Sequence, residues 1–283
     1  MKFGLMFANV GPFGRPEGLI HLAQTAESVG FESLWNVEHV VVPKGYQSKY
    51  PYSPDGRMPG ADDSPIPDPL IWLAYAAAVT TKIKLATGII ILPQRHPFYI
   101  AKEVATLDVL SRGRVVLGVG IGWLEEEFKA VGVPFESRAA RTEESIAAIR
   151  ELWGKGASEH SGEHYAWSSV ESNPKPVQAR IPIVIGGHTK GAARRAARVG
   201  DGFFPARPDT LAECLVELEA ECARVGRKPS EIEITTGCLP KLDEIRRLEA
   251  MGVRRITFGL PGVTNDAVKA GLEKLGNEII AKL

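Results

Sequence analysis

The chain has 283 residues, of which 44% are hydrophobic and 24% are charged, so it is long and apolar enough to bury a sizeable core. Its 34 Lys and Arg residues balance 34 Asp and Glu residues, which leaves no overall field that would attract nucleic acid or an anionic membrane. The sequence has no apolar run of about 18 residues, which predicts no membrane span. The first residues, MKFGLMFANV, lack the pattern of a secretion signal, and we expect a cytoplasmic protein.

Strand-like and helix-like segments alternate along the whole chain. The predicted strands cover residues 2–8, 33–37, 83–92, 114–119, 181–185, 202–204, 232–236 and 255–259. The predicted helices cover residues 16–29, 68–80, 97–110, 124–131 with 138–153, 189–199, 210–225, 241–251 and 265–283. Several strands are almost continuously apolar, which is typical of parallel strands covered on both faces. The pattern predicts an α/β fold, a single (β/α)8 TIM-barrel domain over residues 1–283. The predicted barrel has a long loop after strand 2 and an insertion before strand 5. A doubly wound open sheet is the alternative, because periodicity does not decide closure.

The second predicted strand ends in an acid and a histidine, of which the histidine is the candidate catalytic residue. In a TIM barrel, function gathers on the loops that follow the strands. Glu38 and His39 occupy this place after strand 2, and residues 41–67 then form a loop rich in Pro, Gly and Tyr that is long enough to be a lid. An imidazole titrates near neutral pH, so His39 could give or take the proton that accompanies a hydride. A purely structural histidine is the alternative.

The segment IPIVIGGHTKGAARRAARV, residues 181–199, predicts a phosphate site. A buried strand stops at Gly186 and Gly187, and a helix follows at once with Thr189 as its N-cap. The dipole would favour acids in the first turns, but this helix carries only cations, namely Lys190, Arg194, Arg195 and Arg198. Exposed N–H groups with positive charge suit a bound phosphate. Alternatively, the glycines only form a turn and the basic side chains form a solvated face.

The other strand ends offer few groups that could react on their own. They present no lysine suited to a Schiff base and no converging set of metal ligands, and we expect no metal. His160 and His164 have the spacing of a zinc pair but lie in a polar insertion. The glycines after strand 4, at positions 118, 120 and 122, precede three glutamates that would repel a pyrophosphate. We interpret them as room for a flat ring, or alternatively as close strand packing. Such a face suits an enzyme whose reactive atoms come from a bound cofactor.

Four segments in this order carry a family resemblance. They are GIIILPQRHP (88–97), GRVVLGVGIGWLEEEFKAVGVPFESRAARTEE (113–144), PIVIGG (182–187) and GDGFFP (200–205). Together they resemble the luciferase-like monooxygenase superfamily, and more narrowly its branch that uses the deazaflavin coenzyme F420. The resemblance implies a TIM barrel that holds F420 at the C-terminal mouth and commonly forms a homodimer.

The resemblance also assigns roles to residues. It implies that the cofactor ring lies against a bulge in strand 3, with a non-prolyl cis peptide expected at Thr87–Gly88, and that Ile121 and Gly122 line the ring. The residues matching the family's phosphate cradle are Gly186, Gly187, Thr189 and Lys190.

The Glu38–His39 pair matches an acid–histidine pair of the F420-dependent sugar-phosphate dehydrogenases, in which the histidine acts beside the ring. The resemblance therefore implies that His39 is catalytic and that Glu38, like Thr87 and Gly88, binds the cofactor. The chain departs from that group at Trp123, where those enzymes place a catalytic glutamate. Glu126 lies one turn further on. A sugar-phosphate substrate is therefore in doubt.

The sequence thus predicts an oxidoreductase that transfers a hydride between F420 and a small organic substrate. An FMN-dependent luciferase-like monooxygenase is the alternative, and a cofactor-binding carrier without turnover is a third possibility. We expect no nucleic-acid partner.

Overall fold

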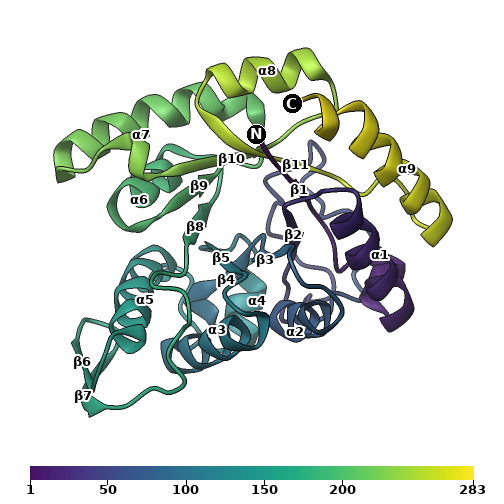
Figure 1. The fold of residues 1–283 in the computed structure, drawn as a ribbon. Helices are drawn as coiled ribbons and strands as arrows, with labels where there is room; N and C mark the ends of the chain where they lie inside the picture. Colours follow the sequence, from purple (N-terminus) through teal and green to yellow (C-terminus); the bar gives the residue numbers. More distant parts are fainter.

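Short, mostly buried strands alternate with helices, and the strands close into a parallel barrel. The computed structural model describes residues 1–283. All barrel pairings are parallel, in the order β3-β2-β1-β11-β10-β9-β8-β5-β4, and an additional β3–β5 pairing closes the ring (Figure 1). The barrel strands are β1 (Lys2–Leu5), β2 (Ser33–Asn36), β3 (Lys84–Thr87) with β4 (Ile90–Ile91), β5 (Val115–Gly120), β8 (Ile183–Gly186), β9 (Gly202–Phe204), β10 (Glu233–Gly237) and β11 (Val253–Phe258). This closure confirms the predicted TIM barrel and makes the open-sheet alternative wrong.

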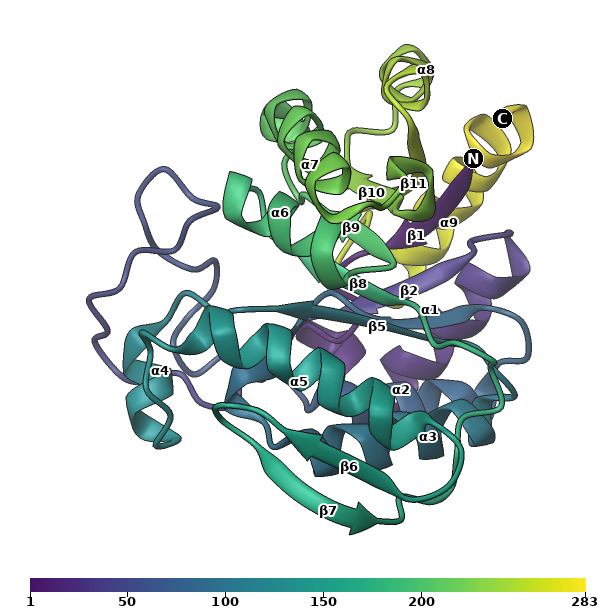
Figure 2. The same ribbon diagram turned by 90° about the vertical axis from the view of Figure 1, so that its left-hand side faces the viewer.

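The helices form the outer layer of the barrel (Figures 1 and 2). They are α1 (Pro16–Ser28), α2 (Pro69–Val79), α3 (Pro97–Ser111), α4 (Glu125–Ala130), α5 (Arg138–Trp153), α6 (Lys190–Val199), α7 (Leu211–Val225), α8 (Leu242–Ala250) and α9 (Asn265–Glu278). Short 3₁₀ turns lie at Gly11–Gly14, Leu92–Gln94, Pro208–Thr210, Pro229–Glu231 and Ile280–Lys282. Side-chain caps fix several helix starts: Asp68 accepts from Leu70 N–H and Ile71 N–H before α2, and Thr189 accepts from Ala192 N–H in α6. None of the helices combines the length and the hydrophobicity that a membrane span requires.

Two hydrophobic cores hold the layers together. The larger core has 51 buried residues and includes Leu34, Leu85 and Ile183, which face the helices. The smaller core fills the inside of the barrel and consists of Trp35, Ala86, Val116, Val184 and Phe204. The Trp35 and Phe204 rings meet edge to face at 5.2 Å. The barrel interior is therefore packed, and chemistry is confined to its mouth.

The third predicted strand is interrupted by a bulge. β3 ends at Thr87 and β4 begins at Ile90, and a non-prolyl cis peptide bond joins Gly88 to Ile89. The predicted position, Thr87–Gly88, is wrong by one residue. Gly88 N–H still donates to Asn36 O at 2.6 Å, so the chain continues its pairing with β2 through Gly88 and turns only after it.

The insertion before the fifth barrel strand forms an antiparallel hairpin. It consists of β6 (Ser158–Ser161) and β7 (Ala166–Val170), which lie below α5 in Figure 2. The loop after β2, residues 41–67, contains no helix or strand.

Candidate active site

A buried carboxylate holds His39 at the mouth of the barrel. His39 Nδ1 lies 3.0 Å from Glu127 Oε2, and the exposed fractions of the two side chains are 8% and 0%. The other oxygen, Glu127 Oε1, accepts from Val40 N–H at 2.7 Å and from Val41 N–H at 3.2 Å. Because a carboxylate only accepts, the arrangement places the Nδ1 proton toward Glu127 and leaves Nε2 for other chemistry. Sequence reasoning missed Glu127, since nothing but burial separates it from Glu125 and Glu126.

Aromatic rings surround His39 and continue across the mouth. Trp123 meets the His39 ring at 5.7 Å and the Tyr50 ring at 5.2 Å. Tyr50 meets Tyr52 at 5.3 Å, and Tyr52 meets His188 at 4.7 Å. The loop after β2 therefore reaches from the end of its own strand to the segment that follows β8.

Glu126 anchors this loop. Its Oε1 accepts from Gln47 N–H at 2.6 Å and from Ser48 N–H at 3.2 Å, and its Oε2 accepts from the Ser48 hydroxyl at 2.6 Å. The Ser48 hydroxyl, together with the two N–H groups, lowers the pKa of Glu126 to about 2. Glu126 is therefore ionised at neutral pH and is engaged by the loop.

Glu38 lies beneath the bulge of the third strand. Its Oε2 accepts from Ile91 N–H at 2.6 Å, and its Oε1 accepts from Arg95 Nε at 2.9 Å and from Arg95 Nη2. Burial disfavours the charged form of Arg95, but Glu38 and Asp68 outweigh this effect and raise the pKa of Arg95. The Glu38 side chain is 1% exposed, so it supports the bulge from below. Thr87 is also buried, and its hydroxyl donates to Gly118 O at 2.6 Å.

The glycines at the end of β5 are packed against protein atoms. A Cβ at Gly118 would lie 1.9 Å from Thr87 O, and one at Gly120 would lie 2.6 Å from Ile89 Cδ1. Gly122 has φ +78°, and its Cβ would meet Phe128 at 2.6 Å. Close packing of the bulge onto β5, the alternative that the sequence left open, therefore accounts for Gly118 and Gly120. Ile121 is partly exposed beside them.

The end of β8 has the backbone geometry of an anion cradle. Gly187 has φ +130°, and a Cβ there would lie 2.9 Å from Ala192 Cβ. Thr189 Oγ1 accepts from Ala192 N–H, while the N–H groups of His188 and Thr189 have no acceptor in the chain. Lys190 is exposed and forms no ion pair. Free N–H groups at a helix start, with one unpaired cation, fit a phosphate group.

The arginines of α6 are not part of this cradle. Arg194 pairs with Glu217 at 2.6 Å, Arg195 lies 3.4 Å from Glu143, and Arg198 pairs with both Glu143 and Glu221. These pairs join α6 to α5 and α7. Of the four cations of the helix, only Lys190, the one assigned to the cradle, is left without an ion pair.

The remaining polar groups near the strand ends do not form a metal or thiol site. No cluster of three or more His, Cys, Asp or Glu residues could hold a metal ion. His160 Nδ1 lies 2.8 Å from Glu151, while His164 N–H donates to Glu144. The three cysteines are free, and burial raises the pKa of Cys238 to about 12, so its thiol stays protonated.

Known proteins resemble this chain over most of its length. The family model described as luciferase-like monooxygenase matches residues 1–250. A protein of Mycobacterium tuberculosis described as uncharacterized is 32% identical over 259 residues, which cover 91% of this chain and 92% of that one. The F420-dependent glucose-6-phosphate dehydrogenase of Amycolatopsis mediterranei is 32% identical over 201 residues, which cover 70% of this chain and 55% of that one.

A solved structure shares the fold. The F420-dependent tetrahydromethanopterin reductase of Methanopyrus kandleri superposes with a TM-score of 0.78 at 19% identity, covering 99% of each chain. Together with the family match over residues 1–250, these findings show that the chain belongs to the luciferase-like monooxygenase family.

Proposed function

We propose that the protein is an F420-dependent oxidoreductase that transfers a hydride between F420 and a small organic substrate. One observation carries the proposal: ring contacts run from His39, held by Glu127, through Trp123 and the loop tyrosines to His188 beside the cradle. His39 and the free N–H groups after β8 therefore lie at one mouth, as proton transfer beside a bound phosphate would require. The F420-dependent relative supports the choice of coenzyme.

In this proposal, one set of residues binds the coenzyme and His39 transfers the proton. Gly186, Gly187, Thr189 and Lys190 would hold the phosphate, and the Gly88–Ile89 bulge with Ile121 and Gly122 would support the ring. F420, when bound, supplies the hydride or accepts it. His39 Nε2 takes or gives the accompanying proton while Glu127 fixes the other ring nitrogen.

The charge near the mouth favours F420 over FMN, because F420 carries an acidic oligoglutamate tail. Arg57, Arg138 and Arg141 form no ion pair with a carboxylate. Arg57 lies over the Tyr46 ring at 5.0 Å, and Arg138 lies over the Phe135 ring at 3.7 Å. Such cations are available to an acidic tail beyond the cradle.

Two alternatives have specific support. The description of the matching family model, luciferase-like monooxygenase, favours a monooxygenase, which is the reaction of the FMN-dependent alternative. The scarcity of reactive side chains at the other strand ends favours a carrier without turnover. Trp123 stands where the F420-dependent sugar-phosphate dehydrogenases place a catalytic glutamate, and this departure argues against a sugar phosphate as substrate.

Fluorescence titration with F420 and separately with FMN tests the coenzyme. We expect micromolar or tighter binding of F420 and much weaker binding of FMN. Tight binding of FMN alone contradicts the proposal. Steady-state oxidation of reduced F420 with a panel of unsaturated and carbonyl substrates distinguishes an enzyme from a carrier, because a carrier gives no turnover with any of them.

We also propose that the protein is a homodimer. α2 contains no charged residue, yet Ile71 and Tyr75, one turn apart on its outer face, have exposed fractions of 74% and 45%. Exposed apolar side chains that lie together on one helix are typical of a surface covered by another protein chain.

A further inference from the structure

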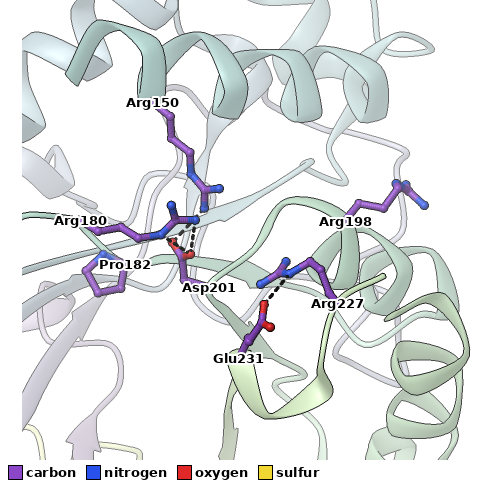
Figure 3. A pocket seen from close by; sticks show the side chains of 7 residues that line it. All are labelled: Arg150, Arg180, Pro182, Arg198, Asp201, Arg227 and Glu231. Atoms are coloured by element: carbon purple, nitrogen blue, oxygen red, sulfur yellow. Dashed lines mark hydrogen bonds and ion pairs between the residues drawn. The ribbon is translucent and has the colours of Figure 1, made fainter. Parts of the chain in front are cut away.

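A cavity of about 630 Å³ lies at the end of the barrel opposite the mouth, and charged side chains line it. Pro182 and Asp201 precede β8 and β9, whereas Arg150 lies near the end of α5 and Arg227 follows α7. Because these positions precede the strands, the cavity is separate from the candidate active site, which is built from loops that follow the strands. The lining residues are Arg150, Arg180, Pro182, Arg198, Asp201, Arg227 and Glu231 (Figure 3).

One carboxylate serves two of the arginines. Asp201 accepts from Arg150 Nη2 at 2.9 Å and from Arg180 Nε at 2.8 Å, and it also accepts from Ile183 N–H at 2.9 Å. Its oxygens are therefore fully engaged. The Arg150 Nε atom is buried without any acceptor, although both arginines point at the same carboxylate in Figure 3.

A third guanidinium is fixed beside them. Arg227 Nη1 donates to Ala197 O at 2.8 Å and to Gly200 O at 2.9 Å, while its Nε makes only a 3.3 Å contact with Glu231. Its Nη2 atom has no partner. Two backbone carbonyls therefore hold this cation in place without neutralising its charge.

The cavity has more positive than negative charge. Its four arginines face two carboxylates. Arg198 contributes least, because its guanidinium points away in Figure 3 and pairs with Glu143 and Glu221 outside the cavity. Burial lowers the pKa of Arg150, and the neighbouring Arg180 and Arg227 lower it further, against the attraction of Asp201. The cations repel one another, and a bound anion would relieve this repulsion.

We infer that this cavity is a second anion site, which binds a phosphate group through Arg150, Arg180 and Arg227. Unused N–H donors in planar guanidinium groups match the oxygens of a phosphate dianion. The volume exceeds that of inorganic phosphate, so a phosphomonoester fits the cavity as well. The inference does not depend on the proposed function, because it uses none of the residues at the mouth.

Thermal unfolding of the full chain without coenzyme tests the inference. At constant ionic strength, replacing NaCl with 10 mM sodium phosphate should raise the unfolding midpoint by about 2 °C or more. Arg180→Gln should lose at least half of this rise, because it removes an exposed cation of the cavity. Arg247→Gln, which removes an exposed arginine of α8, should keep the full rise.

The cradle at the mouth provides the critical comparison, because it could also bind phosphate. Lys190→Gln should leave the rise unchanged if the anion binds in the arginine cavity. A rise that disappears in Lys190→Gln and persists in Arg180→Gln overturns the inference. No rise in the wild-type protein overturns it as well.

A variant with the opposite effect keeps the test valid even if Arg180→Gln fails to fold. Glu231→Gln removes one of the two carboxylates while keeping a polar side chain, so calorimetric titration with phosphate should show roughly threefold or greater tightening. Unchanged or weaker affinity contradicts the inference. Titration with glycerol phosphate identifies the source of the anion: tighter binding than inorganic phosphate points to an organic phosphate, and equal binding points to the free ion.

Discussion

The charge of Glu127 decides which nitrogen of His39 is available. In Glu127→Gln, the amide oxygen stays with Val40 N–H and Val41 N–H, so the amide nitrogen donates to His39 Nδ1 and moves the ring proton to Nε2. We expect kcat to fall by about tenfold or more, with coenzyme affinity changed by less than about threefold. Steady-state kinetics and fluorescence titration measure the two effects.

The matched control for this variant is Glu125→Gln, which changes an exposed acid in the same helix turn. It should leave kcat within about twofold of the wild-type value. Equal losses in both variants would show that the helix, and not the contact with His39, is responsible.

Lys190 tests the cradle with less disturbance than its glycines. Gly187 has φ +130°, so any side chain there strains the backbone, and a weaker affinity of Gly187→Asp would not isolate charge. Lys190→Gln should weaken F420 binding about five- to tenfold by removing one exposed cation from the phosphate. Fluorescence titration measures it, with Lys274→Gln in α9 as control. An affinity equal to that of the control would show that Lys190 does not take part in binding the phosphate.

At the residue scale, candidate site residues could be located from the sequence, but the residues that contact them could not. His39 and the glycine pair at the end of β8 can be located from the sequence, because each follows directly on an apolar predicted strand. Glu127 and the acceptors of Arg194 and Arg198 could not be found, because each pair joins residues far apart in the chain. Only the packing of α4 and α6 brings these partners together.

The loop after β2 should lose its anchor in acid. The pKa of Glu126 is lowered to about 2 from the ordinary 4.5, so its contribution is complete above pH 4.5 and is lost as the pH falls through about 2. A protease should therefore cut the Glu126→Gln variant faster than the wild-type protein within residues 41–67 at pH 7. It should cut the Glu125→Gln variant at the wild-type rate. Equal protection of both variants would mean that other contacts hold the loop.

Arg114 caps α2 from the barrel. Its guanidinium donates to Ala77 O at 2.9 Å and to Thr80 O at 3.2 Å, and also to Ile83 O and the Thr80 hydroxyl. Because lysine cannot reproduce this fork, Arg114→Lys should lower the free energy of unfolding by about 2 kcal/mol. Urea denaturation measures it. Arg112→Lys, at an exposed neighbour, should change it by less than about 0.5 kcal/mol.

At the element scale, the sequence placed every barrel strand and every principal helix. It missed the hairpin β6–β7, because SEHS and AWSSV alternate too weakly to indicate strands. It also missed the break between Thr87 and Ile90, since an apolar run reads as one continuous strand whether or not the backbone bulges.

The whole molecule offers an apolar face on α2 that a second copy would cover. Ile71→Glu places a charge on this face at a site 74% exposed in the single chain, so monomer stability should change by less than about 0.5 kcal/mol. Light scattering should show a dimer for the wild-type protein and a monomer for the variant. Val216→Glu on α7, at a site 69% exposed, is the control and should stay dimeric. A monomeric wild type, or an unchanged dimer in Ile71→Glu, contradicts this interface.

At the scale of the whole molecule, the sequence favours closure of the barrel without requiring it. The strand count suits a closed barrel, but only the pairing of Leu85 with Val115 and of Ala86 with Val116 joins the two ends of the sheet. Neither pair has a signature in the sequence, because apolar residues occupy central strands in open and closed sheets alike.

The loop after β2 is held more firmly near His39 than near the cradle. Near His39, three hydrogen bonds to Glu126 act as a hinge, whereas near the cradle Tyr52 meets His188 only through two rings at 4.7 Å. We therefore expect the loop to open at its Tyr52 end, where only ring contacts hold it. A ligand would then enter beside β8 first, while Trp123 covers the histidine end.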